Sequence, residues 1–99
     1  DINERIKQDL EANPIKLYMK GSQASSVLIR KAIVDALANY DIEFGSSNIL
    51  EDPEMRQGLK DYFEWPTFPM LVVKGELVGG CDIIMEMHQH GELEEALKG

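Results

Sequence analysis

The sequence predicts an α/β fold, in which a four-stranded mixed sheet is flanked by helices on both faces. Two observations predict it: segments of helical and strand character alternate along the chain, and a two-residue turn at Lys74-Gly75 joins the last two strands into a hairpin. A strand–helix–strand unit followed, after another helix, by a hairpin gives a mixed sheet covered on both faces. With 99 residues, 43% of them hydrophobic, we expect one domain over residues 1–99.

The chain opens with a predicted helix and a predicted strand. Ile2, Ile6 and Leu10 recur at helical spacing, which indicates a helix with one apolar face. Asn13-Pro14 ends this helix, because the residue before a proline disfavours the helical backbone. Residues 15–19 then read as a strand.

A small polar segment leads into the longest predicted helix. Ser25 or Ser26 is the expected cap, because a serine hydroxyl can accept a hydrogen bond from a free N–H of the first turn. A second strand is expected over residues 42–50. The helix between them, about four turns long, is predicted from six apolar residues: Val27, Ile29, Ile33, Val34, Leu37 and Tyr40.

The second half of the chain predicts three helices around the hairpin. Residues 51–54, Glu-Asp-Pro-Glu, are typical of a helix start, and this helix reaches about Tyr62. After the hairpin, a helix is predicted over residues 82–89, Gly91 breaks it, and residues 92–97 form a last short helix. This order of elements is the layout of thioredoxin-like folds.

Composition argues against several function classes. Eighteen acidic and ten basic residues give a formal charge of −8, which repels nucleic acids and anionic membrane surfaces. A lone cysteine forms neither an internal disulfide nor a Cys-x-x-Cys pair, so we expect an intracellular protein. No apolar run approaches the length of a membrane span, and no signal-peptide pattern opens the chain.

Two short motifs flank the hairpin. Pro69, at the head of an apolar strand, has no N–H for a sheet ladder, so the backbone before it is free to pair with an extended peptide ligand. After the hairpin, Gly79-Gly80 leads into a helix whose first turn carries Asp82. Amides at such a helix start can bind a carboxylate.

These residues resemble the monothiol glutaredoxins, a family of thioredoxin-like fold. The combination of Trp-Pro-Thr-Phe-Pro with Gly-Gly-Cys-Asp is highly specific, and the resemblance runs through nearly the whole chain. It implies a single glutaredoxin domain over residues 1–99. The matching segments are Leu17–Ser22, Asn48–Asp52, Arg56–Lys60, Trp65–Pro69, Gly75–Ile83 and Gly91–Leu93.

The resemblance also implies a glutathione site. Lys20 and Arg56 would lie near the glycine carboxylate, which an arginine can hold in a bidentate fork. The Phe68 backbone would pair with the ligand's cysteine, next to a proline that we expect to be cis. The Cys81 N–H and Asp82 would hold the γ-glutamyl end, where Asp82 can accept from the ammonium group. Secondary ligand-site candidates are Thr67, Pro69 and Gly80.

One element of the family pattern is missing. Monothiol glutaredoxins carry Cys-Gly-Phe-Ser at the N-terminus of the helix after Met-Lys-Gly, where the helix dipole lowers the thiol pKa. Residues 22–30 contain no cysteine here. The spacing from Lys20 to Phe44 is nearly that of the family, which favours replacement of the motif near residues 27–30 over omission of a segment after Ser22. We therefore predict no catalytic residue and no metal ligand.

Two functions remain open. The first is the family's function: glutathione binding and a bridging 2Fe-2S cluster in a homodimer, for cluster transfer and redox homeostasis, with BolA-type and iron–sulfur recipient partners. Such chemistry needs a thiolate, and Cys81 reads more readily as a small buried apolar residue than as a nucleophile. The alternative is a non-catalytic module with an altered active-site loop that still binds glutathione or a partner. The resemblance allows the cytoplasm and the matrix of mitochondria or plastids.

Overall fold

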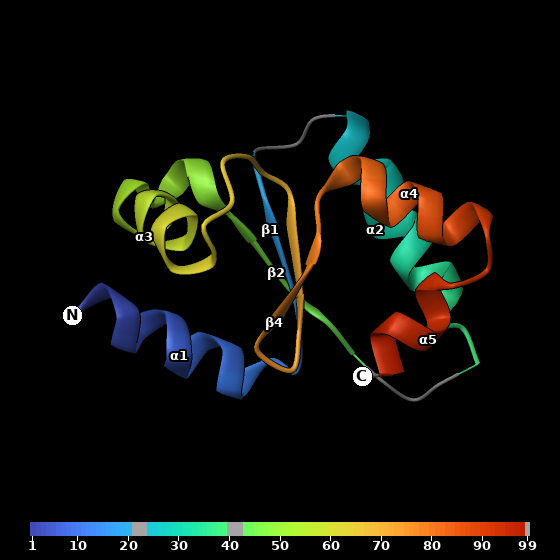
Figure 1. Cartoon of the computed structure of the whole chain (residues 1–99), viewed down its shortest axis with the longest axis horizontal. Helices are drawn as coiled ribbons and strands as arrows, with labels where there is room; N and C mark the ends of the chain where they lie inside the picture. The colour runs from blue at the N-terminus through green and yellow to red at the C-terminus, as the bar shows by residue number, and fades with distance from the viewer. Residues whose placement is uncertain (21–23, 40–42, 99) are drawn as a thin grey trace.

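A four-stranded mixed sheet forms the centre of the protein in a computed structural model (Figure 1), with the strand order β2-β1-β3-β4. β1 (Ile15–Met19) pairs in parallel with the edge strand β2 (Gly45–Asn48). On its other side β1 pairs antiparallel with β3 (Met70–Val73), which pairs antiparallel with β4 (Glu76–Gly79). The predicted mixed sheet is thereby confirmed. The structure describes residues 1–20, 24–39 and 43–98.

Helices cover both faces of the sheet, as predicted. Figure 1 shows α1 (Ile2–Ala12) and α3 (Pro53–Phe63) on one face. The other face carries α2 (Ala24–Ala36), α4 (Cys81–Gln89) and α5 (Leu93–Lys98). Each face buries its own apolar cluster, because successive side chains of a strand point to opposite sides.

The side chains of β1 show this division. Leu17 is fully buried in the cluster beneath α2, α4 and α5, which we call the first cluster. Tyr18, the next residue, is fully buried in the cluster beneath α1 and α3, which we call the second cluster. A one-residue shift of β1 would exchange these two surroundings and bury the wrong side chains.

The long helix differs from its prediction. α2 begins at Ala24, so Ser25 and Ser26 lie inside it and neither caps it. Val27 and Val34 are 59% and 53% exposed, although both were predicted to belong to the apolar face. They are seven residues apart, about two helical turns, and so share the outward side of the helix. The inward side carries Ile29, Ala32 and Ile33, and Leu37, directly after the helix, is buried with them. Tyr40 lies outside the described residues.

The second strand is also shorter than predicted. β2 ends at Asn48, because residues 49–51 form a short 3₁₀ helix. Asn48 caps this helix: its side chain accepts a hydrogen bond from the Leu50 N–H at 3.1 Å. Residues 43 and 44 have no strand structure, and Ile42 lies outside the described residues.

Local signals around α3 and the hairpin were predicted well. Asp52 caps α3 by accepting a hydrogen bond from the Met55 N–H at 3.1 Å, with Pro53 in the first turn. The turn between β3 and β4 uses Lys74 and Gly75 at φ values of +51° and +82°. The peptide bond between Phe68 and Pro69 is cis, as expected.

Candidate functional site

Three parts of the predicted glutathione site meet at one end of the sheet. Lys20 directly follows β1, and Phe68 and Pro69 directly precede β3. Tyr18 pairs with Met70, which brings the end of β1 beside the start of β3. Leu71 pairs with Gly79, so the end of β4 and the start of α4 lie at the same end (Figure 1).

The start of α4 presents free backbone donors. Gly80 is its N-cap, and no side chain caps the helix there. The first N–H groups of an α-helix have no partner within the helix, and the N-terminal end carries a partial positive charge. Asp82 is exposed in the first turn, while Cys81 contributes its backbone at the first helical position. An anionic group is favoured at this position, with Asp82 beside it as an acceptor for a cation.

Gly80 brings the start of α4 against the loop before β3. A Cβ atom at Gly80 would lie 3.3 Å from the Pro69 carbonyl oxygen and 3.5 Å from the Trp65 indole nitrogen. Both Gly80 and Pro69 are buried, whereas Thr67 between the loop's two prolines is exposed. The absence of a side chain at Gly80 therefore fixes how closely the helix approaches the loop.

The loop itself is held by packing. Trp65 and Phe68 are partly buried against the second cluster. The Trp65 indole nitrogen is buried and has no hydrogen-bond partner in the part of the chain that the structure describes. These two aromatic side chains anchor the backbone that we predicted to pair with a ligand.

Cys81 is placed as a small apolar residue. It is partly buried and packs against the first cluster, and it forms no disulfide. Its backbone N–H, rather than its thiol, belongs to the free donors at the start of α4.

The two predicted cations reach this end from different elements. Lys20 is exposed after β1. Arg56 is half-buried on α3, four residues after the Asp52 cap, and therefore approaches from the face opposite α4 (Figure 1). The described structure thus places the candidates on both faces around the same end of the sheet.

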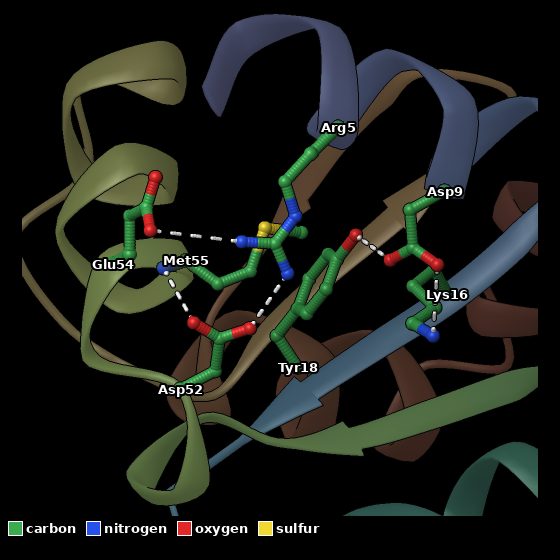
Figure 2. A network of polar contacts seen from close by, with 7 residues as sticks. All are labelled: Arg5, Asp9, Lys16, Tyr18, Asp52, Glu54 and Met55. Carbon is green, nitrogen blue, oxygen red and sulfur yellow. Dashed lines mark hydrogen bonds and ion pairs between the residues drawn. The ribbon is translucent and has the colours of Figure 1, made fainter. Parts of the chain in front are cut away.

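A polar network joins α1 to β1, and it was not predicted from the sequence. Figure 2 shows the Asp9 carboxylate between Tyr18 and Lys16: the Tyr18 hydroxyl donates to Asp9 Oδ2 at 2.6 Å, and Lys16 Nζ lies 3.4 Å from Asp9 Oδ1. Burial and this hydrogen bond raise the pKa of Tyr18 far above its usual range. Lys16 interrupts the apolar strand sequence and is buried, and a buried ammonium group needs a partner. A lysine within this apolar strand was the signal in the sequence that a partner for it was needed.

A second set of polar contacts joins α1 to the start of α3. Arg5 Nη2 donates to Asp52 Oδ2 at 2.8 Å, and Arg5 Nη1 lies 4.0 Å from Glu54 Oε2 (Figure 2). The hydrogen bond from Arg5, followed by the one from the Met55 N–H, lowers the pKa of the Asp52 carboxyl. These contacts join α1 to the helix that carries Arg56.

A groove with a volume of about 790 Å³ lies between α1 and β2, beside this network. Arg5 and Asp9 line one side, Ser46 and Ser47 line the other, and Tyr18 lies between them. None of the five primary glutathione candidates lines this groove. This groove therefore belongs to the α1 face and not to the end of the sheet described above.

The sheet order, the flanking helices and the cis proline before β3 define a thioredoxin-like fold. The family model for glutaredoxins matches residues 31–78, beginning directly after the segment Val27–Arg30. The chain is 48% identical over 96 residues to Glutaredoxin 4 of Haemophilus ducreyi, covering 96% of this chain and 90% of that protein. It is 46% identical over 99 residues to Monothiol glutaredoxin-S11 of rice, covering 98% of this chain.

The chain belongs to the monothiol glutaredoxins, as its motifs predicted. It spans only 20% of the rice relative and 30% of Glutaredoxin 3 of zebrafish, so these are much longer proteins.

Solved structures agree with the fold. The solution structure of reduced poplar apo GrxS14 has a TM-score of 0.78 at 36% identity, covering 98% of this chain and 90% of that one. The buckwheat glutaredoxin–glutathione complex has a TM-score of 0.79 at 21% identity, covering 98% of this chain and 87% of that one. Within residues 1–20, 24–39 and 43–98, no helix has the length and apolar character needed to cross a membrane.

Proposed function

We propose that this protein is a glutathione-binding glutaredoxin module without thiol catalysis. The observation that carries the proposal is the uncapped start of α4, where Gly80 is packed against Pro69. Free helix N-terminal amides suit the γ-glutamyl carboxylate of glutathione, and an acidic side chain beside them suits its ammonium group. The buckwheat glutaredoxin of the same fold is described in complex with glutathione, which supports this ligand.

Each candidate residue has a role in this proposal. Lys20, directly after β1, and Arg56, on α3, bind the glycine carboxylate. The Phe68 backbone pairs with the ligand's cysteine as an added extended strand. The Cys81 N–H and the Asp82 carboxylate hold the γ-glutamyl group. Thr67, Pro69 and Gly80 shape the surface on which the ligand lies.

The chain's own residues do not fit a 2Fe-2S cluster. Protein ligation of such clusters relies on cysteine thiolates, and the chain has one cysteine, which packs against the first cluster at the start of α4. Among the described residues, no three His, Cys, Asp or Glu side chains gather closely enough to hold a metal ion. Cluster transfer, the homodimer that bridges a cluster, and BolA-type or iron–sulfur recipient partners therefore stay predictions of the family resemblance. An intracellular location stays a prediction as well.

Isothermal titration calorimetry with reduced glutathione tests the proposed site. Arg56→Gln and Asp82→Asn are each expected to weaken binding by about 1–3 kcal/mol, or about 5-fold to 150-fold, because each removes a charge-assisted hydrogen bond. Lys74→Gln and Glu76→Gln are matched controls, since both residues are exposed at the opposite end of the sheet. Unchanged affinity in the two site variants would refute the assigned roles.

Reconstitution with iron, sulfide and glutathione tests the absence of cluster chemistry. A colourless monomer is expected, because the motif cysteine is missing. Charge-transfer absorption together with dimerisation would contradict the proposal. Intact-mass measurement belongs to the same experiment, since extra mass located between Ser22 and Gln23 would restore the possibility of the family's motif.

A further inference from the structure

Three large apolar side chains are exposed near the starts of α2 and α4. Val27 and Leu28 are 59% and 57% exposed near the start of α2. Ile83, in the first turn of α4, is 37% exposed. Exposed apolar side chains gathered at one place often mark a binding surface. We call Val27, Leu28 and Ile83 the apolar rim.

The positions of α2 and α4 bring the rim to the end of the sheet that holds the site. Ala24 follows Lys20 by four residues, which limits the distance between their Cα atoms to about 14 Å. Ile29, directly after Leu28, shares the first cluster with Cys81. Figure 1 shows the starts of α2 and α4 at the same end of the sheet as the end of β1.

We infer that the site accepts glutathione conjugates that carry an apolar substituent on sulfur, and that Val27 and Leu28 contact this substituent. This inference rests on the proposed function. A glutathione held by its two ends, at Lys20 and at Asp82, has its cysteine in the middle. A substituent on that sulfur extends from the site, and the start of α2 offers it apolar side chains.

The rim offers apolar contact and no reaction. A thioether has no S–S bond for a thiolate to attack, and no cysteine lies on α2, so the conjugate's bonds stay intact. Burial of two methylene groups of the substituent raises affinity about tenfold. The substituent is thereby bound as a ligand group and not transferred.

Calorimetry with reduced glutathione, S-methylglutathione and S-hexylglutathione tests the inference on the full chain. We expect S-hexylglutathione to bind about tenfold more tightly than S-methylglutathione. The double variant Val27→Ser/Leu28→Ser should lose this difference while its affinity for reduced glutathione stays the same. Val34→Ser is the matched control, because Val34 is 53% exposed on the same helix two turns away and should leave the difference intact.

Each outcome separates the inference from the proposed function. Equal affinity for the two conjugates, or a hexyl gain that survives in the double variant or disappears in Val34→Ser, overturns the inference and leaves glutathione binding in place. Failure of all three ligands to bind overturns the proposed function and the inference with it. The two single variants give the same test if the double variant unfolds in a thermal melt.

Discussion

Replacing Tyr18 by phenylalanine removes one hydroxyl from the network in Figure 2 and leaves the ring in place. That hydroxyl is buried and donates to the Asp9 carboxylate at 2.6 Å. A hydrogen bond to a charged group contributes about 1.5–3 kcal/mol to stability. For a chain of this size, a loss of about 2 kcal/mol lowers the melting temperature by roughly 8–16 °C. Lys16 stays near Asp9, so the carboxylate is not left without a partner.

The pH dependence of the stability difference between wild type and Tyr18→Phe gives a second, independent test of this hydrogen bond. The pKa of Tyr18 is raised in the folded protein, first by burial and then by its bond to Asp9. Above pH 10 an unfolded tyrosine loses its proton while folded Tyr18 keeps it, so the unfolded state binds fewer protons and stability falls as pH rises. The stabilisation of the folded state by Tyr18 is complete below about pH 10, and about 1.4 kcal/mol of this free energy is lost by pH 11.

A thermal melt at pH 8 measures the first effect and urea unfolding at pH 8, 10 and 11 measures the second, both with circular dichroism as the signal. The stability difference between wild type and Tyr18→Phe should shrink by about 1.4 kcal/mol from pH 8 to pH 11. Tyr62→Phe is the control, because Tyr62 is exposed and should change neither stability nor its pH dependence. A melting temperature within about 2 °C of wild type, or a difference that is constant with pH, would refute the assignment of Asp9 as the partner.

Three further predictions concern the start of α4 and the start of α3. Gly79→Ala places a Cβ atom 2.8 Å from Ile83 Cβ at a φ of +155°, so unfolding by urea should show a loss of about 1–3 kcal/mol; an unchanged midpoint would contradict this packing. Gly80→Ala pushes α4 away from the Pro69 carbonyl oxygen at 3.3 Å, and calorimetry should show at least threefold weaker glutathione binding, whereas equal affinity would show that the contact is unimportant. The pKa of Asp52 is lowered in the folded protein, so its ionised form stabilises the fold. The stability advantage of wild type over Asp52→Asn should therefore be complete above about pH 4 and vanish as pH falls below it. If thermal melts from pH 2 to 7 differ between the two proteins by a constant amount, the ionised Asp52 carboxylate does not stabilise the fold.

The parts of the fold that were predicted correctly carry local signals. The start of α3 was marked by Asp52 and Pro53, and the hairpin turn by Lys74-Gly75. Such signals act within a few residues and need no knowledge of the rest of the fold. The four-stranded mixed sheet then followed from the sequence of elements, because short connections and a hairpin allow few arrangements.

The errors concern features that tertiary packing decides. Val27 and Val34 fit helical spacing as well as the true core residues do, and only the position of α2 against the sheet shows that they face outward. The partner of Lys16 lies seven residues away on another element, so the sequence could indicate that a partner was needed but not that it was Asp9. For the candidate site, the family resemblance implied that Lys20, Phe68 and Asp82 hold one ligand, and the pairing of the strands brings these residues to one end of the sheet.

A titration of ¹⁵N-labelled protein with reduced glutathione, followed by NMR, tests the central claim most directly. The amide signals of Phe68, Cys81 and Asp82 are predicted to shift with one common dissociation constant, while those of Lys74 and Glu76 at the opposite end of the sheet stay in place. Absence of any shift, or shifts confined to the groove between α1 and β2, would contradict the proposed glutathione site.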